Sequence, residues 1–217
     1  YYLLDFSRLF PPESPSAAHR MGHLYQLLRP EFVRMYERPL CSDAYSSFTC
    51  PNHPDKARRD AAEAHDAEID AATAYLTGAL VEAFAQRLVL LPAEQRAAFP
   101  LVERLHEAGI NCRHLGRVYG FVANSRDAYW AARLLVEMAA RVMRSEADAL
   151  LRRKMLELRH PGECAYRGAV VLYLNLVLGC SPASAAHWAQ SLAPGMAAKF
   201  PGFGATALGA APGAVRE

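Results

Sequence analysis

Seven cationic side chains in the second half of the chain are spaced in a way that suits phosphate binding. Arg113 and Arg117 are four residues apart on one expected helix, and Arg141 and Arg144 are three residues apart on the next. Three consecutive cations follow on a third expected helix: Arg152, Arg153 and Lys154. If these helices pack as neighbours, their cations converge on a surface that binds the phosphates of RNA.

The alternative is that these cations lie on solvated helix faces and pair with nearby acids, namely Glu137, Glu146, Asp148 and Glu157. The formal net charge is +2 and the isoelectric point is about 8.3. This balance is far from the strongly basic one of a dedicated nucleic-acid-binding module. The near-neutral charge favours the interpretation in which the cations lie on solvated helix faces. RNA binding would then require a local basic patch.

Thiols and imidazoles are the next candidates for chemistry. The cysteines are scattered, at positions 41, 50, 112, 164 and 180, without a Cys-x-x-Cys pair, which indicates reduced thiols in an intracellular protein. Cys50 with His53, and Cys112 with His114, lack the second ligand pair of a zinc site. We therefore expect no metal ion and no cofactor.

No arrangement of nucleophile, base and oxyanion site is readable along the chain. It contains no Gly-x-Ser-x-Gly, no His-Glu-x-x-His and no glycine-rich phosphate loop, so the sequence predicts a protein without enzymatic activity. A hydrolase or transferase stays open as the alternative, because the partners of a Cys/His site need not be close in sequence. Cys112 beside a histidine is the first such pair to look for.

The elements that must position these side chains are helical. The chain has 40 alanines among 217 residues, and alanine is the best helix former. Apolar residues recur about every four positions over 55–88, and similar stripes predict helices over 30–37, 99–108, 126–143, 163–179 and from Ser181 onward. A motif resembling a capping box at Ser145 predicts a separate helix that runs to about Leu158.

The predicted fold class is all-α: a multi-helix globular domain of about seven to nine helices, with a short strand over 1–6 and a flexible C-terminal tail. The segment 163–179 is apolar nearly all round, so we expect a central core helix there. The predicted core comprises Leu76, Leu80, Phe84, Ile110, Leu115, Leu135, Met138, Val171, Leu174 and Trp188. No uninterrupted apolar run reaches the ~18 residues of a bilayer span, so we expect no membrane insertion.

Several stretches, in order along the chain, resemble the clustered mitochondria (Clu) protein family. Residues 1–13, which end in Pro-Pro-Glu, are similar to the close of the Clu domain, and residues 23–33, with Leu-Arg-Pro-Glu, resemble the piece that follows. The most specific match to the family's Gly-Ile-Asn-Met-Arg-Tyr-Leu-Gly motif is made by Gly109, Ile110, Asn111, Arg113, Leu115 and Gly116. Cys112 and His114 depart from it, and residues 136–141 and 187–200 resemble later helices of the family.

This resemblance implies a helical region of a cytoplasmic, non-enzymatic protein that acts in mitochondrial distribution and associates with mRNA for mitochondrial proteins. The implied partners are mRNA, ribosome-associated proteins and other regions of a longer parent chain. The implied parts are the end of the Clu domain at 1–38, a loop at 39–54, a helical central domain at 55–203 and a disordered tail at 204–217. Within the Gly-Ile-Asn motif we expect a structural role, with Gly109 ending one helix and Asn111 capping the next.

Overall fold

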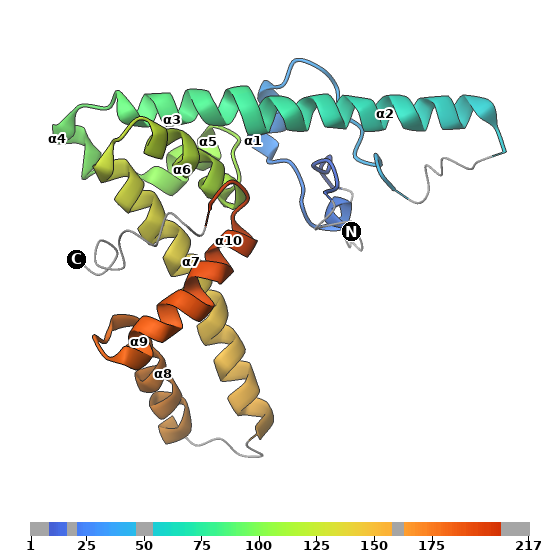
Figure 1. The fold of residues 1–217 in the computed structure, drawn as a ribbon. Helices are drawn as coiled ribbons and strands as arrows, with labels where there is room; N and C mark the ends of the chain where they lie inside the picture. Colours follow the sequence, from blue (N-terminus) through green and yellow to red (C-terminus); the bar gives the residue numbers. More distant parts are fainter. Residues whose placement is uncertain (1–8, 17–20, 47–53, 158–162, 205–217) are drawn as a thin grey trace. The chain divides into compact units, whose positions relative to one another are not determined.

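The computed structural model describes residues 9–16, 21–46, 54–157 and 163–204, except for the side chains of 163–165 (Figure 1). The fold is all-α, as predicted, and the chain divides into two compact units, an N-terminal unit Tyr1–Cys112 and a C-terminal unit Arg113–Glu217. The predicted strand over 1–6, and the predicted tail apart from Gly204, lie outside the described residues. The domain boundaries taken from the family resemblance stay a prediction.

A long helical segment forms the frame of the N-terminal unit. It consists of α2 (Lys56–Tyr75), a π-helix (Leu76–Leu80) and α3 (Val81–Val89), which follow one another without a break. Asp55 caps its start, where its Oδ1 accepts a hydrogen bond of 2.9 Å from the Ala57 backbone N–H. The helix predicted over 55–88 is therefore present, with a local change of pitch that the periodicity did not reveal.

The π-helix moves the apolar face by one residue. Leu76 is buried at its start, and the next buried residue is Val81, five positions later, whereas an α-helix brings the same face round after about four. Leu80, expected in the core, is consequently only half-buried. Phe84 and Leu88 then continue the buried face along α3.

The remaining helices of this unit are α1 (Pro30–Met35), α4 (Ala93–Arg96) and α5 (Leu101–Glu107). Proline suits the first position of α1, because a backbone N–H at that position would have no acceptor within the helix and its absence costs nothing. Gly109 ends α5 in a left-handed conformation, with φ at +76°. Its N–H bonds to the His106 carbonyl at 2.8 Å, and the Ile110 N–H bonds to the Leu105 carbonyl at 3.0 Å, which is a Schellman motif.

Polar contacts join the N-terminal segment to α2. The Ser14 hydroxyl donates to Asp70 at 2.6 Å, and the Ser14 backbone N–H donates to Thr73 Oγ1 at 3.0 Å. The Tyr45 N–H bonds to Asp66 at 2.7 Å, and its hydroxyl donates to Asp70 at 2.5 Å. These bonds hold two separate stretches of irregular backbone against one helix.

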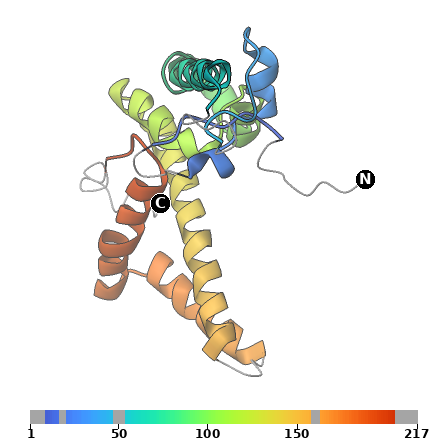
Figure 2. The same cartoon turned by 90° about the vertical axis from the view of Figure 1, so that its right-hand side faces the viewer.

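The C-terminal unit is built around α7 (Ala128–Glu157), which is a single straight rod (Figure 2). A 3-10 turn (Cys112–His114) leads into α6 (Leu115–Asn124), and after α7 come α8 (Glu163–Leu178), α9 (Pro182–His187), a π-helix (Trp188–Leu192) and α10 (Ala193–Lys199). Both α6 and α8 pack on α7, and so does α10. The buried residues of α7 are Trp130, Leu134, Leu135, Met138, Ala139 and Val142.

The prediction of two helices between 126 and 158 is wrong, because α7 is continuous through this range. No glycine or proline occurs between Ala128 and Glu157, so nothing in the backbone favours a break. Ser145 therefore lies in the helix interior, where its hydroxyl accepts a bond of 2.7 Å from Lys199 Nζ. The start of α7 is capped by Asp127, whose carboxylate accepts the Trp130 N–H at 3.1 Å.

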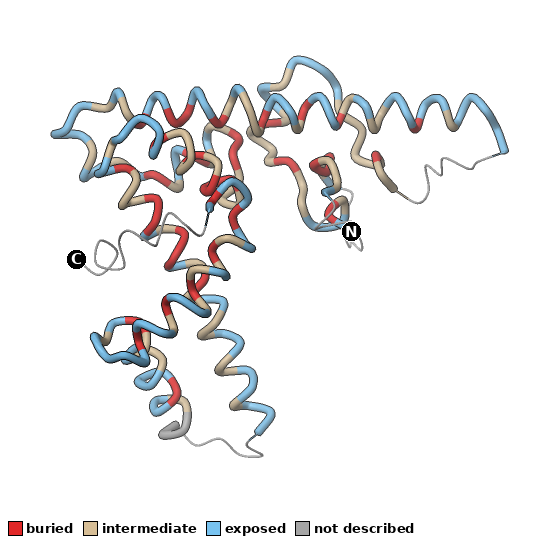
Figure 3. Tube along the Cα trace, viewed as in Figure 1, coloured by how far each residue is buried: buried red, intermediate tan, exposed pale blue. Residues whose placement is uncertain are grey.

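The prediction that 163–179 forms a central core helix is also wrong. Val171 and Leu174, two predicted core residues, are 49% and 46% exposed, while Ala169 and Val177 are buried. Most of the trace of α8 is coloured as exposed in Figure 3. The reason is that α7, α9 and Trp188 of the π-helix cover one side of α8, while most of its other described residues are exposed. The other predicted core residues, except Leu80, are buried: Leu76, Phe84, Ile110, Leu115, Leu135, Met138 and Trp188.

The end of α8 is closed by side chains from α9 and the π-helix after it. The buried Ser184 hydroxyl lies 2.6 Å from each of two carbonyls, those of Leu176 and Gly179. The Trp188 Nε1–H donates to the Val177 carbonyl at 2.9 Å. These contacts satisfy carbonyl groups that a helix end leaves without a partner.

Among the described residues, no single helix has the length and apolar composition of a membrane span. One bent pair, Tyr166–Leu178 with Pro182–Lys199, meets the length and composition criteria together, with an angle of 83° between its arms.

Candidate functional site

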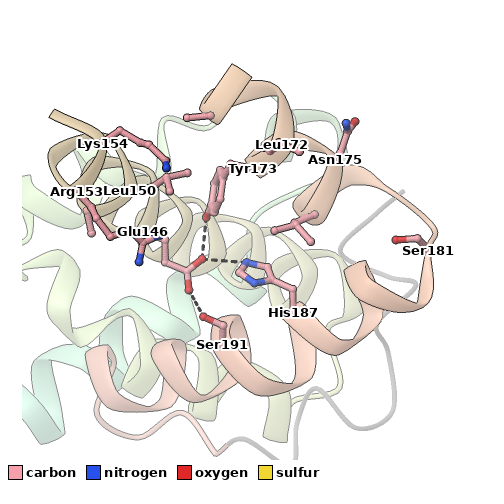
Figure 4. Close-up of a pocket in the computed structure, with 13 residues that line it drawn as sticks. Glu146, Leu150, Arg153, Lys154, Leu172, Tyr173, Asn175, Ser181, His187 and Ser191 are labelled. Atoms are coloured by element: carbon pink, nitrogen blue, oxygen red, sulfur yellow. Dashed lines mark hydrogen bonds and ion pairs between the residues drawn. The ribbon is translucent and has the colours of Figure 1, made fainter. Parts of the chain in front are cut away.

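A polar cluster joins α8, α9 and the π-helix after it to Glu146 of α7 (Figure 4). Glu146 Oε2 lies 2.9 Å from the Tyr173 hydroxyl of α8 and 3.1 Å from His187 Nε2 of α9. Its Oε1 accepts a bond of 2.5 Å from the Ser191 hydroxyl in the π-helix. One carboxylate therefore links α7 to α8 and to the α9 region.

Local helix geometry explains how these groups meet. His187 and Ser191 are four residues apart, so they lie on one helical face and reach the same carboxylate. The pKa of Tyr173 is raised, mainly by burial and also by its bond to Glu146, so its hydroxyl stays protonated and remains a donor at neutral pH.

A cavity of about 660 Å³ opens beside this cluster. Its walls combine leucines and alanines with polar groups, and Arg153 and Lys154 stand on its α7 side. The residues that line it are Glu146, Ala149, Leu150, Arg153, Lys154, Ala169, Leu172, Tyr173, Asn175, Leu176, Ser181, His187 and Ser191. The volume lies in the range of small-molecule sites, roughly 300–1,000 Å³.

The cluster lacks the geometry of a nucleophilic triad. In such a triad the histidine bonds to the serine and the acid bonds to the histidine. Here Ser191 and His187 both bond to Glu146, one to each of its oxygens. The arrangement ties α8, α9 and the π-helix to α7 through one carboxylate.

A second, apolar cavity of about 230 Å³ lies between α7 and α8, and we call it the α7–α8 groove. It is lined by Met143, Arg144, Ala147, Leu150, Leu151, Val170, Tyr173 and Leu174. Beside it runs an exposed row of aliphatic residues on α8, the α8 stripe, made of Val170, Val171, Leu174 and Leu178. Contiguous exposed apolar surface of this kind is typical of protein interaction sites.

The sequence did not predict this surface, although the residues that form it were visible. The apolar run in 163–179 predicts complete burial, whereas only one side of α8 is covered. A mean apolar character cannot separate a core helix from a helix with one packed and one exposed apolar face. The sequence does not predict the Glu146 cluster either, because the partners of Glu146 are 27 to 45 residues away along the chain.

Five of the cations proposed for RNA binding lie on α7, and three of these, Arg141, Arg144 and Arg152, share one side of the helix, within about 80° of one another. Consecutive residues of an α-helix are separated by about 100° around its axis, so Arg152, Arg153 and Lys154 diverge. Arg153 and Lys154 line the larger cavity, whereas Arg144 lines the α7–α8 groove.

Acids of the same helix pair with several of these cations. Arg141 bonds to Glu137 at 2.5 Å, and Lys154 bonds to Glu157 at 2.5 Å, with Arg153 3.9 Å from the same acid. Two of the expected acid pairings are therefore present. Arg117, on α6, is partly buried, and a Cβ on Gly202 would lie 3.1 Å from its Cγ, which is a tight contact.

The Gly-Ile-Asn motif builds a helix junction. Ile110 and Leu115 are fully buried, and Gly109 forms the Schellman end of α5 described above. Gly116 is in close contact with another backbone, because a Cβ there would lie 2.6 Å from the Phe200 carbonyl oxygen. Asn111 directly precedes the 3-10 turn that contains Arg113, and its capping role stays a prediction.

A cysteine does lie beside a histidine in the N-terminal unit. Cys112 Sγ is 3.2 Å from His106 Nε2, which is within hydrogen-bond reach. Glu31 is close enough that His106 helps to lower its pKa, although the hydrogen bond from Arg29 is the main cause. Neither of the two cavities described above is lined by Cys112 or His106.

No group of three or more His, Cys, Asp or Glu side chains suited to a metal ion occurs in the described part of the chain. Cys50 and His53 lie outside that part. Cys112 and His114 flank Arg113 within the 3-10 turn.

Residues 98–195 match the family model described as Translation initiation factor eIF3 subunit 135, a domain found in Clu-family proteins. The match includes the whole Gly-Ile-Asn motif and the Glu146 cluster. No curated protein matches the chain, and no solved structure does. The match indicates a translation-factor-related helical interaction region, similar over less than half of the chain to the family named by the model.

Proposed function

We propose that the chain is a non-enzymatic helical interaction region of a Clu-like protein. In this proposal it acts in the cytoplasm, in mitochondrial distribution and in association with mRNA for mitochondrial proteins. The observation that carries the proposal is the match of 98–195 to a domain found in Clu-family proteins, together with the family-like Gly-Ile-Asn motif inside it. The partners would be mRNA, ribosome-associated proteins or further regions of a longer parent chain.

Two features favour protein contact over direct RNA contact for this region. The α8 stripe presents aliphatic side chains to solvent, which suits a protein partner. Arg141, Arg153 and Lys154 are paired with acids of the same helix, which weakens a shared phosphate-binding surface. In this proposal, mRNA is associated through a bound protein.

The test compares RNA recovered from cells with RNA bound in vitro. Complexes of the tagged chain are fixed in cells with formaldehyde, which also captures RNA held through a bound protein, and the recovered mRNA is sequenced for the wild type and two variants. One variant, Val171→Ser with Leu174→Asp, disrupts the α8 stripe. The other changes Arg141, Arg144, Arg152 and Arg153 to Ala.

We expect enrichment of mRNA for mitochondrial proteins with the wild type and with the arginine variant, and its loss with the stripe variant. Filter binding of the purified chain to single-stranded RNA should show no tight binding at low salt. Tight binding that weakens steeply with salt and disappears in the arginine variant would contradict the scaffold role and indicate direct RNA contact. The absence of any mRNA enrichment in cells would contradict the proposed cellular role.

A hydrolase or transferase is the second candidate, favoured by the 3.2 Å contact between Cys112 and His106. An imidazole beside a thiol promotes the thiolate, which is the nucleophilic form. Mass spectrometry can follow alkylation by iodoacetamide at Cys112, with the exposed Cys180 as internal reference. Alkylation of Cys112 at least ten times faster than that of Cys180, and slowed in His106→Gln, would support a nucleophile. Alkylation of Cys112 that is slower than that of Cys180 would contradict a nucleophile and indicate that the contact with His106 is structural.

A further inference from the structure

The α7–α8 groove and the α8 stripe form one continuous surface with a helical repeat. Val170, Val171, Leu174 and Leu178 recur on one side of α8, and Val170 and Leu174 also line the groove. The stripe covers roughly two turns of helix, about 12 Å at 1.5 Å per residue. A partner helix with apolar residues at positions i, i+3, i+4 and i+7 matches a surface of this length.

Two exposed arginines lie beside this surface. Arg144 is exposed and lines the groove from α7, and Arg167 is exposed on α8 four residues before Val171, in line with the stripe. Nearby acids of α7 are engaged or lie outside the groove: Glu146 bonds to the polar cluster, and Asp148 does not line the groove. An occupant with carboxylates beside its apolar face is therefore complementary in charge.

We propose that the α7–α8 groove binds an acidic amphipathic α-helix of a partner protein. The apolar side of that helix covers Val170, Val171 and Leu174, and its carboxylates face Arg144 and Arg167. This rests on the proposed function, since it names the class of partner that the interaction region takes. A basic helix is rejected by the same two arginines.

The test uses the full 217-residue chain and two synthetic helical peptides, with binding followed by fluorescence anisotropy. Both peptides carry leucine at i, i+3, i+4 and i+7, with glutamate at the flanking positions of one and lysine at those of the other. We expect the glutamate peptide to bind at least ten times more tightly than the lysine peptide. Equal binding of the two, or no binding of either, would overturn the proposal.

Leucine-to-aspartate variants test the place of binding. Leu174→Asp puts a charge into the groove and should weaken binding of the glutamate peptide at least tenfold. Leu156→Asp is the matched control, because Leu156 is 89% exposed on α7 and does not line the groove. Circular dichroism should show the same helix content for both variants. An equal loss of binding in the two would place the peptide elsewhere.

A charge swap tests the arginines. The double variant Arg144→Glu with Arg167→Glu should bind the lysine peptide more tightly than the glutamate peptide, which reverses the preference. Arg152→Glu, on the same helix as Arg144 but outside the groove, should keep the original preference. Failure of the swap to reverse the preference would contradict the charge-based choice of partner.

Two further outcomes separate this inference from the proposed function. Concentration-dependent dimerisation that Leu174→Asp abolishes would identify the occupant as a second copy of this chain and would overturn the acidic helix. Loss of mRNA enrichment in the stripe variant, with no binding of the glutamate peptide, would retain the proposed function and remove this partner. Binding of the glutamate peptide without mRNA enrichment would retain the acidic helix as partner and contradict the proposed function.

Discussion

Gly109 lies directly against the backbone of Phe32. A Cβ at position 109 would be 2.7 Å from the Phe32 Cα, which is closer than real Cβ atoms approach. The contact brings together two of the motifs that resemble the Clu family, Leu-Arg-Pro-Glu-Phe at the start of α1 and Gly-Ile-Asn at the end of α5. Only glycine fits here, because the position also requires a positive φ.

Substitution of Gly109 should therefore destabilise the N-terminal unit. Gly109→Ala combines the left-handed strain of about 1–2 kcal/mol with an overpacking cost of about 1–3 kcal/mol. Urea unfolding should show this as a lower midpoint. Gly78→Ala is the matched control, since nothing lies within 4 Å of its Cβ and its φ is ordinary, so it should stabilise the chain by about 0.5–1 kcal/mol. Similar midpoints for the two variants would contradict the close contact.

Removal of the Glu146 carboxylate should loosen the C-terminal unit. Glu146→Ala leaves Tyr173, His187 and Ser191 without their shared acceptor, at an expected cost of about 1–3 kcal/mol in free energy of unfolding. Asp148→Ala, two residues further along and exposed, should change this free energy by no more than about 0.5 kcal/mol. Chemical denaturation of both variants measures the difference. An equal effect would mean that the cluster contributes nothing specific.

Truncation of leucines should separate the packed part of the C-terminal unit from its exposed face. Leu134→Ala, at a fully buried site in α7, should cost about 2–5 kcal/mol. Leu174→Ala should cost about 1 kcal/mol or less, because this side chain is nearly half exposed. Thermal or urea unfolding tests both. A large loss at Leu174 would mean that α8 is covered in solution.

The Arg29–Glu31 ion pair should make stability depend on pH in the acid range. Arg29 Nε lies 3.0 Å from Glu31 Oε2, and this bond is the main cause of the lowered pKa of Glu31. Because the folded pKa is depressed, the stabilisation is fully present above the unfolded value, about 4.3, and is lost as pH falls through the folded value. The melting-temperature gap between wild type and Glu31→Gln should therefore close below about pH 4.

The exposed Glu37 supplies the control for that measurement. Glu37→Gln should differ little from wild type at any pH. A gap for Glu31→Gln that widens on acidification would contradict the sign of the effect.

Periodicity predicted where helices occur because apolar repeats and breakers are local properties. It placed helices at α1, α3, α5 and α8 and identified Met138 and Trp188 as core residues. Periodicity did not predict which apolar residues are buried where burial depends on how many elements pack around a helix, as the exposure of Val171 and Leu174 shows. The Glu146 cluster depends on side chains 27 to 45 residues apart in sequence, and no local pattern encodes such a meeting.

The π-helix at Leu76–Leu80 makes this part of the chain unusually tolerant to loss of a residue. A π-turn holds about one residue more than an α-turn, so deletion of Thr77, Gly78 or Ala79 would convert it to regular α-helix. Leu76 and Val81 would then be four positions apart and would keep facing the same core. The same deletion within α2, for example at Ala64, would rotate every later apolar side chain by about 100° out of register. Length variation among related sequences should therefore gather at this turn and avoid the helices on either side.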